Sequence, residues 1–485
     1  MTLPPCPPRT LPSLRPARLA AALAILLAAP LAGATEPLPP TPPDDPVLRG
    51  LIDDTLSARP ELKQAEASVA AERARVPQVG ALPDPVLSLG IQNDGFEKIQ
   101  IGEMETSYYQ IMLSQSFPWP GKRGMRRDVA RLSAEAAGAT VSRQRLTAEA
   151  EVRRAYLALQ LVRDRLGLLD QLEALWQKSI GTARARYEAG EGAQSDVLRA
   201  QLELVRLRQR RVALQADETA RLQALNRLRD HPLDEPIALG ARLRDQPLPA
   251  LPDGQAALDD ALARSPELAA ARLSARQADA STTLARRERF PDLGLTVGLM
   301  PRGQLEPMWL ASVSIGLPVW SGSKQGKAVE ERQARGVASA QGQEAVAQTL
   351  RLRVAERRNA LAAALETLRL YRDGLLVQSR ATTESTLAQY RVGKLTFASV
   401  LEANAGYIAD EDGFLQAAAG AQQLAIAAGE VSLDAPGGAG AGGGMGGTPV
   451  PGAGASGGGM SGGGAPAAAA PAEASGGSSS MNSGM

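Results

Sequence analysis

An internal duplication restricts the fold of this chain more than any other feature. A Tyr-x-x-Gly motif followed by Val-Leu occurs in Tyr187–Ala200 and again, 203 positions later, in Tyr390–Ala403. Three shorter matches keep nearly that spacing, beginning at Pro60 and Pro266, at Pro83 and Pro291, and at Phe117 and Leu317. A repeat of this length predicts that each structural element, and any function it carries, is built twice.

The N-terminus predicts a signal peptide over residues 1–34. Three arginines, Arg9, Arg15 and Arg18, precede the apolar run Leu19–Ala29, and Ala32-Gly33-Ala34 matches the small-residue cleavage pattern. The apolar run is shorter than the roughly 20 residues that a membrane-spanning helix needs. Ala34 stands where a lipoprotein signal would have cysteine, so we expect export and cleavage without a lipid anchor.

Removing that segment changes the chemistry available to the chain. The loss of three arginines takes the formal net charge from +1 to −2, which gives no electrostatic reason to bind nucleic acid. Cys6, the sole cysteine, is also lost, so disulfides and thiolate ligands are not expected. His231 is the sole histidine, and Gly322–Ala328 departs from a phosphate loop in spacing and in its last residue. We therefore expect neither an enzyme nor a cofactor.

Composition divides the remainder of the chain into five parts. We expect an N-terminal arm at 35–58 that is extended over its Pro-rich start, a first repeat at 59–230, a connector at 231–258, a second repeat at 259–433 and a disordered tail at 434–485. The tail contains four methionines, whose thioethers suit Cu(I) or Ag(I). Their irregular spacing and the lack of other ligands favour a plain tail over a metal site.

Four segments alternate between apolar and small or polar residues, as strands with one apolar face do. They are Val86–Ile91 and Tyr109–Ser114 in the first repeat, and Leu293–Leu299 and Trp309–Leu317 in the second. A strand of about 9 to 12 residues suits a tilted crossing of a bilayer. Each repeat therefore predicts one β-hairpin.

Long helices are predicted after each hairpin. Proline is absent from about Gly124 to Arg165 and from Gly322 to Arg372. Apolar residues with 4,3 spacing form two seams, one through Ala155, Leu159, Val162, Leu166 and Leu169, the other through Leu198, Leu202, Val205 and Val212. Such spacing favours coiled-coil packing, and 40 to 50 helical residues would form rods of about 60 to 75 Å.

Gly-Leu-Leu steps interrupt both helical patterns. One begins at Gly167, after Arg163-Asp164, and the other at Gly374, after Arg372-Asp373. We interpret both as the tight turns of helical hairpins; the alternative is a glycine inside one continuous helix. At Tyr187 and Tyr390 we expect a helix break and repacking site.

Four strands are too few to close a barrel in lipid, where open strand edges are not tolerated. Membrane barrels start at about eight strands, and three copies of the chain would supply about twelve. Cyclic symmetry would close such head-to-tail contacts. The sequence therefore predicts a pore that continues into a helical tunnel.

The order of elements, the paired Tyr-x-x-Gly motifs and the segment Phe117–Arg123 resemble the TolC family of outer-membrane efflux channels over about Pro46–Val431. The resemblance implies a mainly α fold with a small β part: a homotrimer with a twelve-stranded β-barrel in outer-membrane lipid and an α-helical barrel across the periplasm. It implies docking with a periplasmic adaptor and an inner-membrane pump. The segment Phe117–Arg123 is similar to members that serve heavy-metal pumps of the resistance-nodulation-division type.

The resemblance also assigns roles to residues at the two Gly-Leu steps. It places Gly167, Leu168, Gly374 and Leu375 at a periplasmic tip that contacts the adaptor, although plain turn chemistry explains them equally well. Three charged residues beside the steps, Asp164, Arg372 and Asp373, could ring an aperture or lie on a solvated face, where ion pairs contribute about 0 to 1 kcal/mol. If they form a gate, neutralising Arg372 and Asp373 raises channel conductance.

An architectural role is expected for Pro118, Trp119 and Pro120, with Pro318 and Trp320 in the second repeat. These residues fall where strand gives way to helix; proline ends a strand ladder, and tryptophan suits a membrane interface.

The expected function is a passive exit duct of a tripartite efflux system, with heavy-metal ions as the implied substrate. A drug-efflux or type I secretion channel is the alternative within transport. A soluble periplasmic coiled-coil adaptor is the alternative of another class, and it would lack the four strands.

Overall fold

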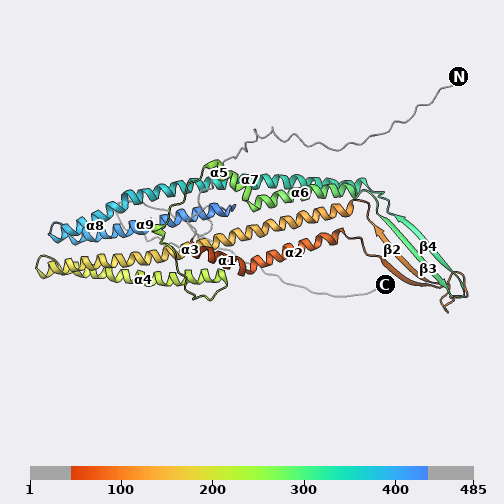
Figure 1. Cartoon of the computed structure of the whole chain (residues 1–485), viewed down its shortest axis with the longest axis horizontal. Coiled ribbons are helices and arrows are strands. Elements are labelled where there is room, and N and C mark those ends of the chain that lie inside the picture. The colour runs from red at the N-terminus through yellow and green to blue at the C-terminus, as the bar shows by residue number, and fades with distance from the viewer. Residues whose placement is uncertain (1–44, 435–485) are drawn as a thin grey trace, which may run out of the picture. The chain divides into compact units, whose positions relative to one another are not determined.

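The computed structural model describes residues 45–434, where one order of elements occurs twice (Figure 1). The first half contains α1 (Pro46–Ala58), α2 (Pro60–Gly80), β1 (Val86–Gln92), β2 (Tyr108–Phe117), α3 (Lys122–Glu188) and α4 (Gln194–Arg229). The second contains α5 (Gly254–Arg264), α6 (Pro266–Arg287), β3 (Leu293–Arg302), β4 (Leu305–Ile315), α7 (Lys327–Leu370), α8 (Leu376–Arg391) and α9 (Phe397–Glu430). The signal peptide and all but the first residue of the tail lie outside the described residues.

Three short helical segments complete the described chain. A 3-10 turn, Leu243–Asp245, lies in the connector. Two π-helical turns, Gly322–Gly326 and Tyr371–Leu375, adjoin α7 at its two ends. The second repeat therefore runs helically from Gly322 to Arg391.

Helices α1 and α5 are local consequences of capping residues. The Asp45 side chain accepts a hydrogen bond from the Val47 amide at 3.0 Å, with Pro46 in the first helical turn. Asp253 caps α5 in the same way, accepting from the amides of Gln255 and Ala256. The expected N-terminal arm is thus helical from Pro46 on, and the last part of the expected connector is α5.

The strands form one antiparallel sheet with the order β1-β2-β3-β4. In its centre Leu113 of β2 pairs with Val297 of β3, which joins the two repeats. Strands β1 and β4 are outermost, so each has one edge without a partner strand within the described chain. The two predicted hairpins are confirmed.

Helix α3 is the common support of the helical part. It contains 67 residues, which at about 1.5 Å per residue gives a length near 100 Å. It packs against α2 and α6 near the sheet, and against α4 and α9 farther along (Figure 1). Residues from both repeats therefore share its surface.

Small side chains permit this close packing of helices. Ala148 and Ala183 on α3, Ala200 on α4 and Ala421 on α9 are completely buried. The main apolar cluster gathers around the far half of α3 and contains Trp176, Leu172, Tyr390, Phe397 and Phe414. Ion pairs between repeats supplement it, with Arg165 and Asp412 at 2.7 Å and Arg143 and Glu267 at 2.5 Å.

Candidate functional site

The passage from strand to helix is a cluster that joins the two repeats. Lys122, the first residue of α3, is only 4% exposed and donates to the Phe290 carbonyl and to Asp292 Oδ1, both at 2.7 Å. The Trp119 amide donates to the same Asp292 oxygen at 2.8 Å. The Trp119 ring stacks on Phe290 with centroids 5.4 Å apart. Burial acts to raise the pKa of Asp292, but the hydrogen bonds from Lys122 and Trp119, together with the charge of Lys122, outweigh it and hold that pKa below its usual value.

The corresponding passage of the second repeat has no such cluster within the described chain. Trp320 is 75% exposed, as are its neighbours Leu317 and Val319. Lys324 and Asp84, the charged residues near the corresponding positions, are exposed and form no ion pair within residues 45–434. Pro118, Trp119 and Pro120 thus follow a strand and precede a helix as expected, while Pro318 and Trp320 do so on an open surface.

The turns predicted at the Gly-Leu steps are wrong. Gly167 and Leu168 lie inside α3, and Gly374 and Leu375 lie in the π-helical turn between α7 and α8. Space around Gly167 and Gly374 is open, so neither glycine is required by a close contact. Helix-favouring residues on both sides, together with packing against α9, maintain the helix through these positions. The alternative, glycine within a continuous helix, holds.

The helical hairpins turn instead at the Tyr-x-x-Gly motifs. Gly190 and Gly393 both have a φ of +75°, a conformation that side chains disfavour. Their amides donate to the carbonyls of Tyr187 and Tyr390 at 2.9 and 3.0 Å. The helix break expected at these two tyrosines is therefore confirmed.

A polar network connects the two turns. The Tyr390 hydroxyl donates to Asp196 Oδ2 at 3.0 Å, and the Arg186 guanidinium lies 4.9 Å from the centre of the Tyr390 ring. Arg186 also donates to the carbonyls of Tyr390 and Glu191. Burial, followed by the hydrogen bond to Asp196, raises the pKa of Tyr390 to about 12. Arg186 and Asp196 were not among the predicted site residues, although Arg186 directly precedes Tyr187 and Asp196 directly precedes Val197 of the repeated motif.

None of the three residues predicted to gate an aperture lies at the turn of a helical hairpin. Asp164 lies 24 positions before the end of α3, about 36 Å along the helix. Its Oδ2 accepts from the Leu243 amide of the connector at 2.8 Å, and burial raises its pKa. Arg372 and Asp373 are exposed in the π-helical turn. The predicted grouping of the three at a hairpin end is thus wrong.

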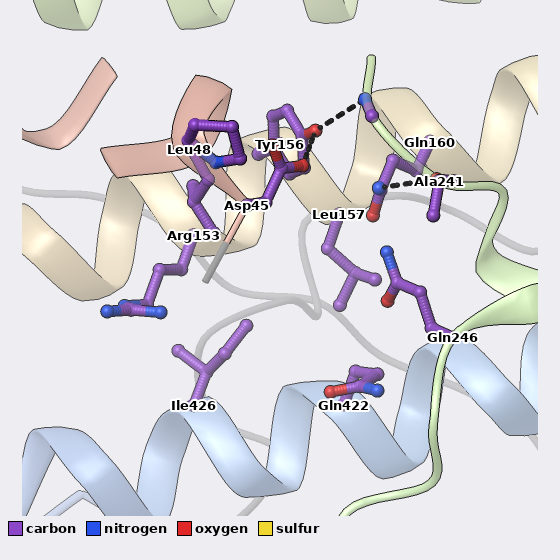
Figure 2. A pocket seen from close by; sticks show the side chains of 12 residues that line it. Asp45, Leu48, Arg153, Tyr156, Leu157, Gln160, Ala241, Gln246, Gln422 and Ile426 are labelled. Carbon is purple, nitrogen blue, oxygen red and sulfur yellow. Dashed lines mark hydrogen bonds between the residues drawn. The ribbon is translucent and has the colours of Figure 1, made fainter. Parts of the chain in front are cut away.

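A pocket of about 250 Å³ lies where α1, α3, the connector and α9 meet (Figure 2). The Tyr156 hydroxyl donates to Asp45 and accepts from the Gly240 amide, and Gln160 donates to the Ala241 carbonyl at 3.1 Å. Burial and the Asp45 hydrogen bond raise the pKa of Tyr156 to about 12. These hydrogen bonds connect α3 to the start of α1 and to the connector.

Two surfaces expose apolar side chains in rows. Leu87, Leu89 and Ile91 of β1 are exposed, Leu89 by 72%. The seam predicted on α4, Leu198, Leu202, Val205 and Val212, is also exposed, whereas Leu159, Val162 and Leu169 of the α3 seam are buried. Soluble chains rarely expose such continuous apolar rows without a partner or a membrane to cover them.

None of the described helices is long and apolar enough to cross a membrane. Within residues 45–434, no group of three or more acidic, histidine or cysteine side chains is placed to hold a metal ion.

The described chain thus combines an open four-stranded sheet with two long helical hairpins, one from each repeat. The sequence profile described as "Outer membrane efflux protein" matches residues 51–230 and 257–428, one stretch in each repeat. The chain belongs to this family.

A curated relative carries a metal-resistance name. The nickel-cobalt-cadmium resistance protein NccC of Alcaligenes xylosoxydans xylosoxydans is 25% identical over 277 residues. The alignment spans 57% of this chain and 62% of that protein, less than two thirds of its length.

Solved structures share the fold. The outer-membrane channel OprN has a TM-score of 0.67 at 23% identity, covering 80% of this chain and 90% of OprN. A membrane protein from Pseudomonas aeruginosa has a TM-score of 0.68 at 20% identity, covering 84% and 98%. CusC, whose structures concern transmembrane channel formation, has a TM-score of 0.64 at 19% identity, covering 80% and 91%.

Proposed function

We propose that this chain is the outer-membrane duct of a tripartite efflux system. The observation that carries the proposal is the four-stranded sheet, which ends in two unpaired edges and exposes apolar side chains along β1. In lipid such edges must be paired, and copies of the same chain are the natural source of further strands. Three copies would close a barrel of about twelve strands in the outer membrane.

The helical hairpins support the second part of the duct. The seam of α4 is exposed, and in the other helical hairpin α7 and α8 expose Val337, Leu352, Leu370 and Val377. Packing α4 of one copy against α7 and α8 of the next would cover both apolar rows and form a tube extending into the periplasm. The turns at Gly190 and Gly393 would lie at its far end, where we place the adaptor contact.

The proposed partners are a periplasmic adaptor and an inner-membrane pump of the resistance-nodulation-division type, which supplies the energy. The duct has no catalytic role. Heavy-metal ions are the proposed substrate, supported by the name of the relative NccC. A drug-efflux or type I secretion duct is the alternative; the sheet argues against the soluble adaptor.

Membrane fractionation tests the duct directly. The protein is expected in the outer-membrane fraction after a carbonate wash, with the mass of three chains in mild detergent. Recovery as a soluble monomer would exclude the duct.

A deletion strain then tests the substrate. It is expected to lose tolerance to nickel, cobalt or cadmium salts and to regain it with the plasmid-borne gene. Unchanged metal tolerance with increased sensitivity to organic drugs would transfer the proposal to drug efflux.

A further inference from the structure

The two repeats differ at the junction between strand and helix. The junction after β2 is covered by residues of the second repeat, whereas the junction after β4 is exposed. In the first junction the end of β2 meets the start of β3, so Lys122 reaches Asp292 and Trp119 stacks on Phe290. The equivalent of the β3 start is the start of β1, which follows Leu82 and Asp84. The equivalent of the β2 end is the end of β4, which precedes Trp320 and Lys324. These two ends are at opposite edges of the sheet, so one chain cannot bring them together.

The two open ends are complementary in charge, and their residue order matches that of the closed junction. Asp84 follows Leu82-Pro83 as Asp292 follows Phe290-Pro291. Trp320 precedes Gly322 by two positions, as Trp119 precedes Gly121. Lys122 directly follows Gly121, whereas one residue separates Lys324 from Gly322. Lys324 lies in the π-helical turn Gly322–Gly326, and a π-helical turn accommodates one additional residue.

We propose that a second copy of this chain completes the open junction. Asp84 and Leu82 of one copy bind Lys324 and Trp320 of the next, rebuilding between copies the cluster that Lys122, Asp292, Trp119 and Phe290 form within one copy. This inference rests on the proposed function, because it requires β4 and β1 of adjacent copies to pair.

The same repeat relation fixes the register of that pairing. Leu317 is 200 positions after Phe117, and Pro83 is 208 positions before Pro291. Applying these shifts to the observed β2–β3 pairs gives the β4–β1 pairs: Leu113 with Val297 becomes Val313 with Leu89, and Gln115 with Leu295 becomes Ile315 with Leu87. A heterologous contact of this kind forms a ring when the rotation from one copy to the next completes a circle.

Cysteine pairs test the register in the full-length chain, with Cys6 replaced by serine. Residues directly opposite in antiparallel strands have Cα atoms about 4.5 to 5.5 Å apart, within the range of a disulfide. Val313→Cys with Leu89→Cys is expected to give covalent trimers on non-reducing gels. Val313→Cys with Ile91→Cys, two positions out of register at about 7 Å or more, is the matched control and is expected to remain monomeric.

Leu113→Cys with Val297→Cys is a second control. These residues pair within one chain, so this variant is expected to form its disulfide without a change in mass. It shows that oxidation works at this depth of the sheet.

Charge reversal tests the junction itself. Asp84→Lys or Lys324→Asp alone is expected to raise the dissociated fraction in detergent about tenfold, and the double reversal is expected to restore the assembly. Lys327→Glu, on the same helical run, is the control; its exposed partner Glu330 is in the same chain, so assembly is expected to remain unchanged.

Failure of the inference and failure of the proposed function give different results. If the protein has the mass of a trimer but cross-links only through Val313→Cys with Ile91→Cys, the inference is wrong and the duct remains. The same holds if neither charge reversal changes the dissociated fraction. A chain that is monomeric by native mass before any substitution overturns both.

Discussion

Tyr187 and Tyr390 occupy equivalent positions in the two repeats but have different surroundings. Tyr390 is 2% exposed, packs on Phe397 and donates to Asp196, whereas Tyr187 is 46% exposed. Both tyrosines therefore precede a turn, and it is the Tyr390 side chain that contacts the other hairpin.

Tyr390→Phe is expected to loosen the contact between the two hairpin turns. It removes the hydrogen bond to Asp196 while keeping the ring, a change of about 1 kcal/mol. In planar bilayers the single-channel conductance is expected to rise. The matched control is Tyr187→Phe, whose hydroxyl has no such partner in the described chain; equal conductances for the two variants would contradict the prediction.

Asp164→Asn is expected to raise the thermal midpoint at neutral pH. Burial raises the pKa of Asp164 above its ordinary value of 3.8, so the carboxyl favours folding most when protonated, and this stability is lost as pH rises through the raised pKa. Asparagine retains an oxygen for the Leu243 amide without that charge.

Midpoints measured from neutral pH down to pH 3 test this sign. The gain of Asp164→Asn is expected to shrink as the wild-type carboxyl takes up its proton. Asp373→Asn, on an exposed surface, is the control and is expected to change little. A lower midpoint for Asp164→Asn at neutral pH would contradict the prediction.

At the scale of elements, the glycines of the helical hairpins fall into two kinds. Gly190 and Gly393 have positive φ at turns, whereas Gly167 lies within α3 with open space around it. The same residue type therefore has opposite effects on stability in the two settings.

Alanine at these glycines is expected to change stability in opposite directions. Gly167→Ala is expected to stabilise α3 by about 0.5 to 1 kcal/mol, because alanine loses less backbone entropy in a helix. Gly190→Ala or Gly393→Ala is expected to destabilise by about 1 to 2 kcal/mol through left-handed strain. Chemical denaturation measures the free energy of unfolding of each variant. A lower value for Gly167→Ala would contradict the prediction and favour a turn at that position.

The elements differed in how well the sequence predicted them. Alternation located all four strands, because a sheet with one apolar face leaves a period of two in the sequence. The hairpin turns were misplaced by about 20 residues, because Gly-Leu-Leu has the composition of a turn while helix packing overrides it. The π-helical turns depend on local backbone geometry, which residue patterns do not specify. The caps of α1 and α5 do follow a residue pattern, an aspartate directly before the first helical residue, which the predictions did not use.

The polar contacts were less predictable than the elements. The Lys122–Asp292 pair joins residues 170 positions apart, and no local pattern signals it. Trp119 was predicted from its place between strand and helix. Lys122, Phe290 and Asp292 were not predicted as junction residues, because their contacts depend on the observed β2–β3 pairing.

At the scale of the whole molecule, assembly is expected to depend on the exposed seam of α4. Leu202→Gln with Val205→Gln is expected to reduce the trimer fraction, because both side chains are exposed in the single chain and would be covered between copies. Light scattering in detergent measures the mass. Leu233→Gln, an exposed leucine of the connector, is the control. An unchanged trimer with full helix content would exclude α4 from the contact.

The contacts of Arg143 with the end of α9 also bear on the order in which the chain folds. Arg143 on α3 donates to the Glu430 and Val431 carbonyls at 2.9 and 3.0 Å, across 287 and 288 residues of sequence. Contacts of such separation form late, because the ends of a long loop must first meet. Helix α3 is synthesised in the first half of the chain, so its α9-facing surface stays exposed until α9 has been made and has packed against it. During that interval we expect the apolar side chains of this surface to be prone to aggregation with other chains.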